Sequence, residues 1–249
     1  MDGISEVFHA RFVEHAYPVH THDTWTLLIV DDGAVRFDLD HHERGARRSE
    51  VTLLPPHVPH DGRAATPLGF RKRVLYLDES VLDARLAGAA VDHPGLRDAA
   101  LRRRVHQLHG TLAGPGDELE AASRLALIVD RLRRHLGAGQ DTPPAGRTVA
   151  RRLRELLDER VTDGLSLTEA AGLLHVHPTH LVRAFTAEFG IAPHQYLTGR
   201  RVDLARHLLL AGMRPADVAP AAGFFDQAHL TRHFRRMLGT SPARYAHAR

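Results

Sequence analysis

The sequence predicts a two-domain α+β protein, with a strand-rich N-terminal part and an all-helical C-terminal part. Short runs of β-forming residues, at Trp25–Val30, Ala34–Leu39, Val51–Leu54 and Phe70–Leu77, are separated by turns that contain Asp-Gly, Pro-Pro or Gly. From about Glu79 onward, apolar residues recur every three or four positions, which is the period of a helix. Within roughly the last 100 residues one pattern occurs twice, which indicates a duplicated helical motif.

A Gly- and Pro-rich linker at residues 137–147 is expected to divide the two parts. We expect an N-terminal domain at 1–136, with a small barrel at about 1–78 and helices at about 79–136, and a C-terminal domain at 148–249. The composition, 43% apolar and 25% charged, is typical of globular proteins. The sequence has no cysteine, no apolar run that could cross a bilayer and no signal-peptide start. These features predict a cytoplasmic protein without a membrane partner.

The charge of the chain is unevenly distributed. The formal net charge is +3, but residues 148–249 hold 14 arginines against 9 acidic residues, and residues 1–147 are slightly acidic. A basic C-terminal part beside an acidic N-terminal part suggests that only the C-terminal part binds a polyanion.

The C-terminal part contains an internal repeat at an offset of 49 residues. Seven identical residues recur at this offset, so each copy is expected to be one structural unit. The pairs are His180 and His229, Leu181 and Leu230, Arg183 and Arg232, Phe185 and Phe234, Gly190 and Gly239, Pro193 and Pro242, and Tyr196 and Tyr245.

The first copy has the signals of a helix, a turn and a second helix. Ser166 and Glu169 form a capping box that opens a short helix at Leu167–Leu174. Pro178 occupies the first position of the second helix, and Gly190 ends it as a C-cap. The expected buried face of the second helix consists of Leu181, Phe185 and Phe189.

The second copy follows the same plan. Its first helix is expected at about Pro215–Ala222, and Gly223 makes the turn. Asp226 caps the second helix and Gly239 stops it. The expected buried face consists of Leu230, Phe234 and Leu238.

The outward faces of the two second helices carry side chains suited to DNA. Arginine bonds guanine bidentately, glutamine bonds adenine, and threonine and further arginines hold phosphates. Two such helices spaced by about one turn of duplex can enter successive major grooves. The candidate DNA-binding residues are Thr179, Val182, Arg183, Thr186, Gln227, Ala228, Thr231, Arg232 and Arg235.

Residues 148–249 resemble the DNA-binding domain of the AraC/XylS family of bacterial transcription regulators. The resemblance is strongest at 219–245, where Gly-Phe, Asp226, Leu-x-Arg-x-Phe-Arg-Arg, Gly239, Pro242 and Tyr245 follow the second motif of that family. It implies a sequence-specific regulator that binds promoter DNA as a homodimer, contacts RNA polymerase and is not an enzyme. Activation is the expected mode, although the sequence does not distinguish it from repression. Pro220 departs from the pattern and could kink the first helix of the second motif.

The N-terminal histidines resemble the two short motifs of the cupin barrel, which serves as the effector domain of many AraC-type regulators. His20, His22 and His60 match three metal-binding positions of cupins, but Thr26 stands where their Glu would be. Three imidazoles could hold Zn²⁺ or another divalent ion. The missing carboxylate instead favours a small-molecule pocket without a metal or cofactor. The candidate effector-binding residues are His20, His22, Trp25, His57 and His60.

The helix expected at Glu118–Leu136 has two interpretations. It packs on its own barrel, or its leucine stripe pairs with a second subunit, as the family resemblance favours. Pairing would bury the side formed by Leu125, Val129, Leu132 and Leu136.

Two alternatives to an effector-controlled regulator remain open. One is a metal-dependent cupin enzyme with a helical appendage, which would require a stoichiometric metal. The other is a constitutive dimeric DNA-binding protein whose barrel only dimerises.

Overall fold

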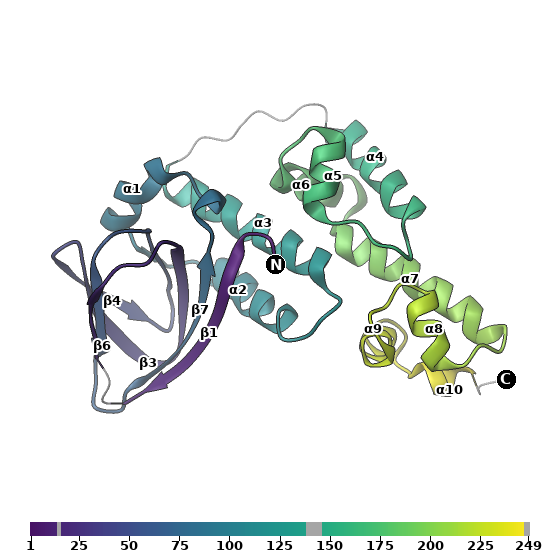
Figure 1. The fold of residues 1–249 in the computed structure, drawn as a ribbon, viewed down its shortest axis with the longest axis horizontal. Coiled ribbons are helices and arrows are strands. Elements are labelled where there is room, and N and C mark those ends of the chain that lie inside the picture. The colour runs from purple at the N-terminus through teal and green to yellow at the C-terminus, as the bar shows by residue number, and fades with distance from the viewer. Residues whose placement is uncertain (14–15, 138–145, 247–249) are drawn as a thin grey trace. The chain divides into compact units, whose positions relative to one another are not determined.

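The computed structural model describes residues 1–13, 16–137 and 146–246 (Figure 1). The chain forms two compact units, one of Met1–His109 with Ile128–Asp141 and the other of Gly110–Leu127 with Thr142–Arg249. Residues 110–127 therefore pack with the C-terminal helices, although they precede the expected linker. Most of that linker, at 138–145, lies outside the described residues, and the expected domain boundaries stay a prediction.

The first unit is built on antiparallel strands, as the sequence predicts. The main path of the sheet runs β1-β7-β3-β5-β8, β4 and β6 also pair with β3, and β2 pairs with β6. The strands are β1 (Ile4–Phe12), β2 (Tyr17–His20), β3 (Trp25–Leu39), β4 (His42–Arg47), β5 (Val51–Leu54), β6 (His60–Ala64), β7 (Phe70–Leu77) and β8 (Gly95–Leu96).

Strand β3 joins two strands that the sequence separates. The Asp-Asp-Gly turn expected after Val30 is instead a bulge in one continuous strand, with a register shift between Val30 and Asp32. Before the bulge β3 pairs with β5 and β7, and from Ala34 onward it pairs with β4 and β6. Gly33 makes this bend possible, because its φ is +70° and a Cβ there would lie 2.1 Å from the carbonyl oxygen of Gly69.

The strands β3 and β7 present different residues on their two faces, because successive side chains of a strand point in opposite directions. Leu28, Val30 and Val74 belong to the apolar core of the barrel. On the other face of β7, Arg73 donates to His106 of helix α2 (Ala99–Thr111), with 2.8 Å between Nη2 and Nδ1. The inner face of the sheet therefore surrounds the barrel core, and its outer face meets a helix.

Helical segments follow the barrel, as expected from Glu79 onward. They are two short 3-10 helices at Glu79–Val81 and Ala84–Leu86, and the α-helices α1 (Ala87–Asp92), α2 and α3 (Glu118–His135). The second half of α3 belongs to the first unit. There Arg131 donates to Asp98, and His135 bonds to the carbonyl of His93.

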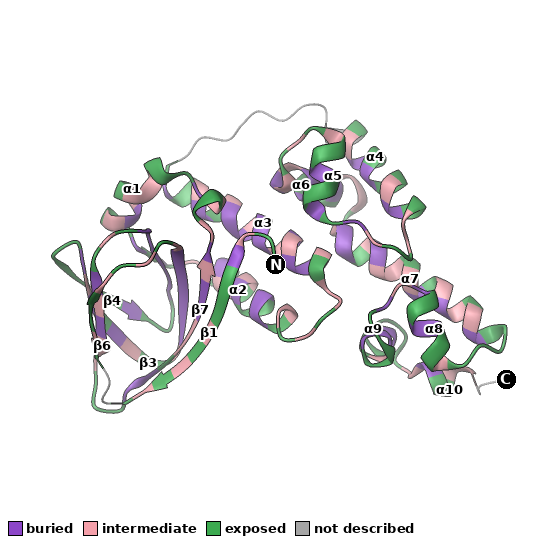
Figure 2. Ribbon diagram, viewed as in Figure 1, coloured by how far each residue is buried: buried purple, intermediate pink, exposed green. Residues whose placement is uncertain are grey.

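The leucine stripe of α3 is buried within the chain, which corrects one expectation. Leu125, Val129, Leu132 and Leu136 are between 0% and 7% exposed. Figure 2 shows parts of α3 coloured as buried. An interface formed by these side chains would need them exposed in the single chain. The interpretation that they pair with a second subunit is therefore wrong for this structure.

The C-terminal helices confirm both predicted helix–turn–helix copies. Ser166 accepts from the Glu169 amide at 3.0 Å, Asp226 accepts from the His229 amide at 2.7 Å, and both second helices end at a glycine in the left-handed conformation. The helices are α4 (Gly146–Glu159), α5 (Leu167–Leu174), α6 (Pro178–Phe189), α7 (Pro193–Leu210), α8 (Pro215–Ala221), α9 (Gln227–Leu238) and α10 (Pro242–Ala246).

The predicted buried faces are confirmed at four of their six positions. Leu181, Phe185, Leu230 and Phe234 are fully buried in two separate apolar clusters. Phe189 is half-buried, and Leu238 is exposed because it lies in the last turn of α9, beside the C-cap. In the described part of the chain, no helix combines the length and apolarity that a membrane span needs.

Replacing Gly33 by alanine is expected to destabilise the protein by roughly 1–3 kcal/mol, because it adds steric overlap and a strained positive φ. Gly88→Ala is the matched control: Gly88 is exposed in α1, and a Cβ there meets nothing within 4 Å. That change should be neutral or slightly stabilising. Urea unfolding of both variants measures the difference, and equal midpoints would contradict the role of Gly33.

Candidate nucleic-acid interface and ligand site

Helix α9 presents the predicted DNA-reading residues together. An open groove is lined by Gln227, Ala228, Thr231, Arg232 and Arg235, the five candidates of the second motif. Four of them are exposed and Thr231 is half-buried. The groove offers an amide, a hydroxyl and two guanidinium groups, which suit base edges and phosphates in a major groove.

Helix α6 presents only part of its predicted surface. Arg183 and Thr186 are exposed, whereas Thr179 and Val182 are 7% and 0% exposed. The hydroxyl of Thr179 donates to the carbonyl oxygen of Ala126 in α3, at 3.3 Å. The expectation that Thr179 and Val182 point outward is wrong for this structure, and their role toward DNA stays a prediction.

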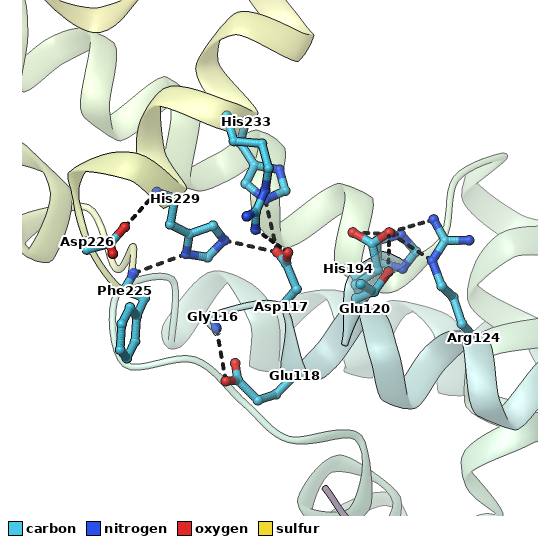
Figure 3. Close-up of polar contacts among 12 residues, drawn as sticks. Gly116, Asp117, Glu118, Glu120, Arg124, His194, Phe225, Asp226, His229 and His233 are labelled. Atoms are coloured by element: carbon cyan, nitrogen blue, oxygen red, sulfur yellow. Dashed lines mark hydrogen bonds and ion pairs between the residues drawn. The ribbon is translucent and has the colours of Figure 1, made fainter. Parts of the chain in front are cut away.

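The carboxylate of Asp117 lies against α9 and binds three of its side chains (Figure 3). Its Oδ1 accepts from Nε2 of His229 and from Nε2 of His233, at 2.9 Å each, and its Oδ2 accepts from Arg232. Burial alone would raise the pKa of Asp117, but the bonds and charges of the two histidines hold it well below its usual value. The carboxylate therefore stays ionised.

Asp117, His229 and His233 could be considered a metal site, because their ligand atoms lie within 4.8 Å of one another. The ring of His229 argues against this. Its Nδ1 accepts from the Phe225 amide at 3.1 Å, so the proton of a neutral ring is on Nε2, the atom that faces Asp117. A metal-binding histidine has the opposite arrangement, with the second nitrogen as a donor. The cluster is a set of hydrogen bonds between Asp117 and α9.

Three of the predicted effector residues meet in the barrel. The ring centroids of His20, His22 and His60 are 4.6 to 5.1 Å apart. Nδ1 of His20 bonds to the Pro18 carbonyl at 2.7 Å, and Nδ1 of His60 bonds to the Val58 carbonyl at 3.0 Å. These bonds place the proton of each ring on Nδ1 and leave Nε2 as an acceptor.

The other two predicted effector residues lie apart from this cluster. Trp25 is fully buried, and it precedes Thr26 and Leu28, which point to the opposite face of β3. Because Leu28 belongs to the barrel core, Trp25 faces away from the barrel. The side chain of His57 is 67% exposed and bonds to Glu79 at 2.5 Å. The structure thus groups neither residue with His20, His22 and His60.

Lys72 and two tyrosines also lie at the barrel site, although they are not among the residues that the sequence predicts there. Lys72 lies on the same face of β7 as Phe70, Val74 and Tyr76, which line the barrel core. Its Nζ lies 4.4 Å from the ring centroid of Tyr17, and the rings of Tyr76 and His22 are 5.1 Å apart. The sequence held one signal of this role: Lys72 is the only lysine of the chain and shares its strand register with apolar residues.

The charges around the barrel histidines are unfavourable for a divalent cation. Burial lowers the pKa of His60 to about 4 and also lowers that of His22, and the Lys72 ammonium lowers both further. The rings of His22 and His60 are therefore neutral, and together with His20 they offer three converging nitrogens, as a metal requires. However, among the described residues no carboxylate is a ligand of this group, the Asp23 charge only partly offsets the lowered pKa of His22, and a lysine whose pKa is about 8 adds positive charge. The donor atoms fit a metal, but the charge does not.

Comparison with known families agrees with this division into a barrel and paired helical motifs. The AraC-like ligand binding domain matches residues 3–129, and a helix-turn-helix domain matches residues 170–248. The chain belongs to the AraC family of transcription regulators. It combines a sheet-rich ligand-binding domain with a helical DNA-binding domain, which confirms the predicted fold class and general function.

Two relatives match most of this chain. An uncharacterized HTH-type transcriptional regulator, YbfI of Bacillus subtilis, is 24% identical over 235 residues, which are 90% of this chain and 85% of the relative. The transcriptional activator NphR of a Rhodococcus species is 30% identical over 240 residues, 90% of this chain and 71% of the relative. Among solved structures, the C-terminal domain of AraT from Geobacillus stearothermophilus is 28% identical, with a TM-score of 0.40, and covers 43% of this chain and 89% of that one.

Elemental analysis of the purified protein is expected to find no transition metal at one ion per chain, because the positive charge of Lys72 acts on His22 and His60 and opposes a divalent cation there. His20→Ala is the matched control, since it removes one of the three donors. A stoichiometric metal that is lost in this variant would contradict the prediction and support the metal-dependent cupin alternative.

Proposed function

We propose that this AraC-family regulator reads promoter DNA with α9 and with the outward face of α6. The observation that carries the proposal is the groove along α9, where the predicted side chains of the second motif lie together on one open surface. The basic balance of residues 148–249 supports the same assignment, because it supplies the charge that duplex DNA attracts.

We further propose that the barrel binds an anionic small-molecule effector at Lys72 and the neighbouring rings. The ammonium group is held on the inner face of β7 beside Tyr17, and the imidazoles of His20 and His60, whose Nδ1 atoms bond to backbone carbonyls, offer Nε2 as a hydrogen-bond acceptor. Because a half-buried ammonium is incompletely solvated, a ligand carboxylate or phosphate would stabilise it. The aromatic rings around it suit an apolar body on the same ligand.

The remaining parts of the proposal rest on the family and on the sequence. They are a homodimer, a contact with RNA polymerase, a cytoplasmic location where the DNA is found, and no enzymatic activity. The dimer interface has to lie outside the leucine stripe of α3, because those side chains are buried within one chain.

Arg232→Ala is expected to lower the affinity for a specific duplex by about 1–3 kcal/mol, because a bidentate contact to a base is lost. The duplex is one that the wild-type chain selects from a random-sequence library, and fluorescence anisotropy at fixed salt measures its affinity. Arg244→Ala is the control, since Arg244 is exposed on α10, outside the groove. An equal loss on selected and scrambled duplexes would make Arg232 a phosphate contact instead.

Lys72→Met is expected to abolish stabilisation by anionic metabolites in a thermal-shift screen. A ligand at 100 times its Kd stabilises the folded state by about 2.7 kcal/mol, which such a screen detects. Arg71→Met is the matched control, because it removes the neighbouring positive charge on the other face of β7. His20→Ala should weaken the same ligands. Unchanged melting and DNA affinity across the whole panel would favour the constitutive alternative.

A further inference from the structure

Residues 110–127, the masking segment, comprise the end of α2, the loop after it and the first half of α3, and they pack with the helix–turn–helix motifs. One contact lies on α9. Asp117 binds Arg232, which lines the proposed DNA groove and keeps a side-chain exposure of 49%. A carboxylate on this guanidinium occupies the donors that a guanine edge or a phosphate would use.

A second contact lies on α6. Leu119, Ala122, Ala126 and Leu127 pack in the same apolar cluster as Val182. The Ala126 carbonyl accepts the hydrogen bond of Thr179, which is 7% exposed, and Val182 is fully buried. The masking segment therefore touches the DNA-facing residues of both motifs.

The close approach of the segment to α9 depends on Gly116. Its φ is +95°, and a Cβ there would lie 2.3 Å from Nδ1 of His229 and 2.9 Å from Cβ of Phe225. Farther along, Arg124 donates to Glu120 at 2.5 Å, and Glu120 lies 3.9 Å from His194 of α7 (Figure 3). Side chains and backbone of the segment thus fit α6, α7 and α9 at separate points.

We propose that residues 110–127 form an intramolecular mask, in which Asp117 holds Arg232 and the start of α3 covers Thr179 and Val182, so that full DNA binding requires its release. The proposal rests on the proposed function, because it takes α6 and α9 as the DNA-reading helices. When only a fraction of the molecules is in the binding-competent state, the apparent affinity is the intrinsic affinity multiplied by that fraction. Weakening the mask therefore has to raise the affinity for DNA.

The principal test compares Asp117→Asn with Glu118→Gln in the full chain. Asparagine keeps the size of the side chain and is an equally good N-cap of α3, but it loses the charge that holds Arg232. Glu118→Gln removes the same charge one residue away, where the carboxylate bonds the Gly116 amide within the segment. We expect Asp117→Asn to tighten binding to the selected duplex about tenfold at fixed salt, and Glu118→Gln to change it little. Equal affinities of Asp117→Asn and wild type would overturn the proposal.

A double-mutant cycle separates release of Arg232 from a general charge effect. In an Arg232→Ala background, Asp117→Asn should give a smaller gain in affinity than it gives in the wild type, because the two side chains act on each other. An undiminished gain would show that Asp117 does not act through Arg232. If Arg232→Ala weakens binding while Asp117→Asn does not strengthen it, the mask is wrong and the proposed function stands. If Arg232→Ala has no effect, the proposed function of α9 is wrong.

Gly116→Ala provides a second route to the same state without a change of charge. The added methyl group overlaps His229 and should displace the segment from α9, raising the affinity in the same direction as Asp117→Asn. Circular dichroism and melting confirm that each variant is folded before binding is measured. Folded Gly116→Ala with wild-type affinity would contradict the mask.

Discussion

The presentation of α9 depends on one largely buried carboxylate, whose side chain is 11% exposed. Asp117 uses both oxygens on donors from a single helix: two imidazoles share Oδ1, and the guanidinium of Arg232 takes Oδ2. A buried charge is costly unless donors surround it, so the carboxylate and the helix stabilise each other. Asp117 precedes α3 and its carbonyl begins the hydrogen bonding of that helix, accepting from the Ala121 amide at 2.9 Å. The position of α9 and the start of α3 are therefore set together.

In the barrel, the corresponding constraint is the alternation of β7. Lys72 points inward to the tyrosine and histidine rings, while Arg73 points outward, bonds Asp31 bidentately at 2.6 and 2.8 Å and also contacts His106. A shift of this strand would move an inner, ligand-facing group and an outer, helix-facing group at once. The helix on the outer side is α2, and the masking segment follows it directly in the chain. One strand thus joins the proposed effector site to the element that precedes the mask.

The sequence predicted the features that depend on local chemistry. Caps, such as Ser166 and Asp226, and terminal glycines depend on a few neighbouring residues, so the helices of both motifs begin and end nearly as expected. The burial of Thr179, Val182 and the α3 stripe could not be predicted, because it comes from packing between segments far apart in sequence. The expectation for Trp25 was wrong for a related reason. Trp25 is close to the histidines in the sequence, but the strand register places its side chain on the other face of β3.

The two contacts of the masking segment differ in what can displace them. Arg232 keeps half of its side chain in solvent, so a phosphate or base can approach it and compete with Asp117 by charge alone. Thr179 and Val182 are covered by apolar side chains, and no approaching charge removes that cover. In the state that the structure shows, DNA can therefore engage the groove of α9 before α6 is complete. Full engagement of both motifs then requires the first half of α3 to leave α6, and this movement is the step that a signal from the barrel has to supply or permit.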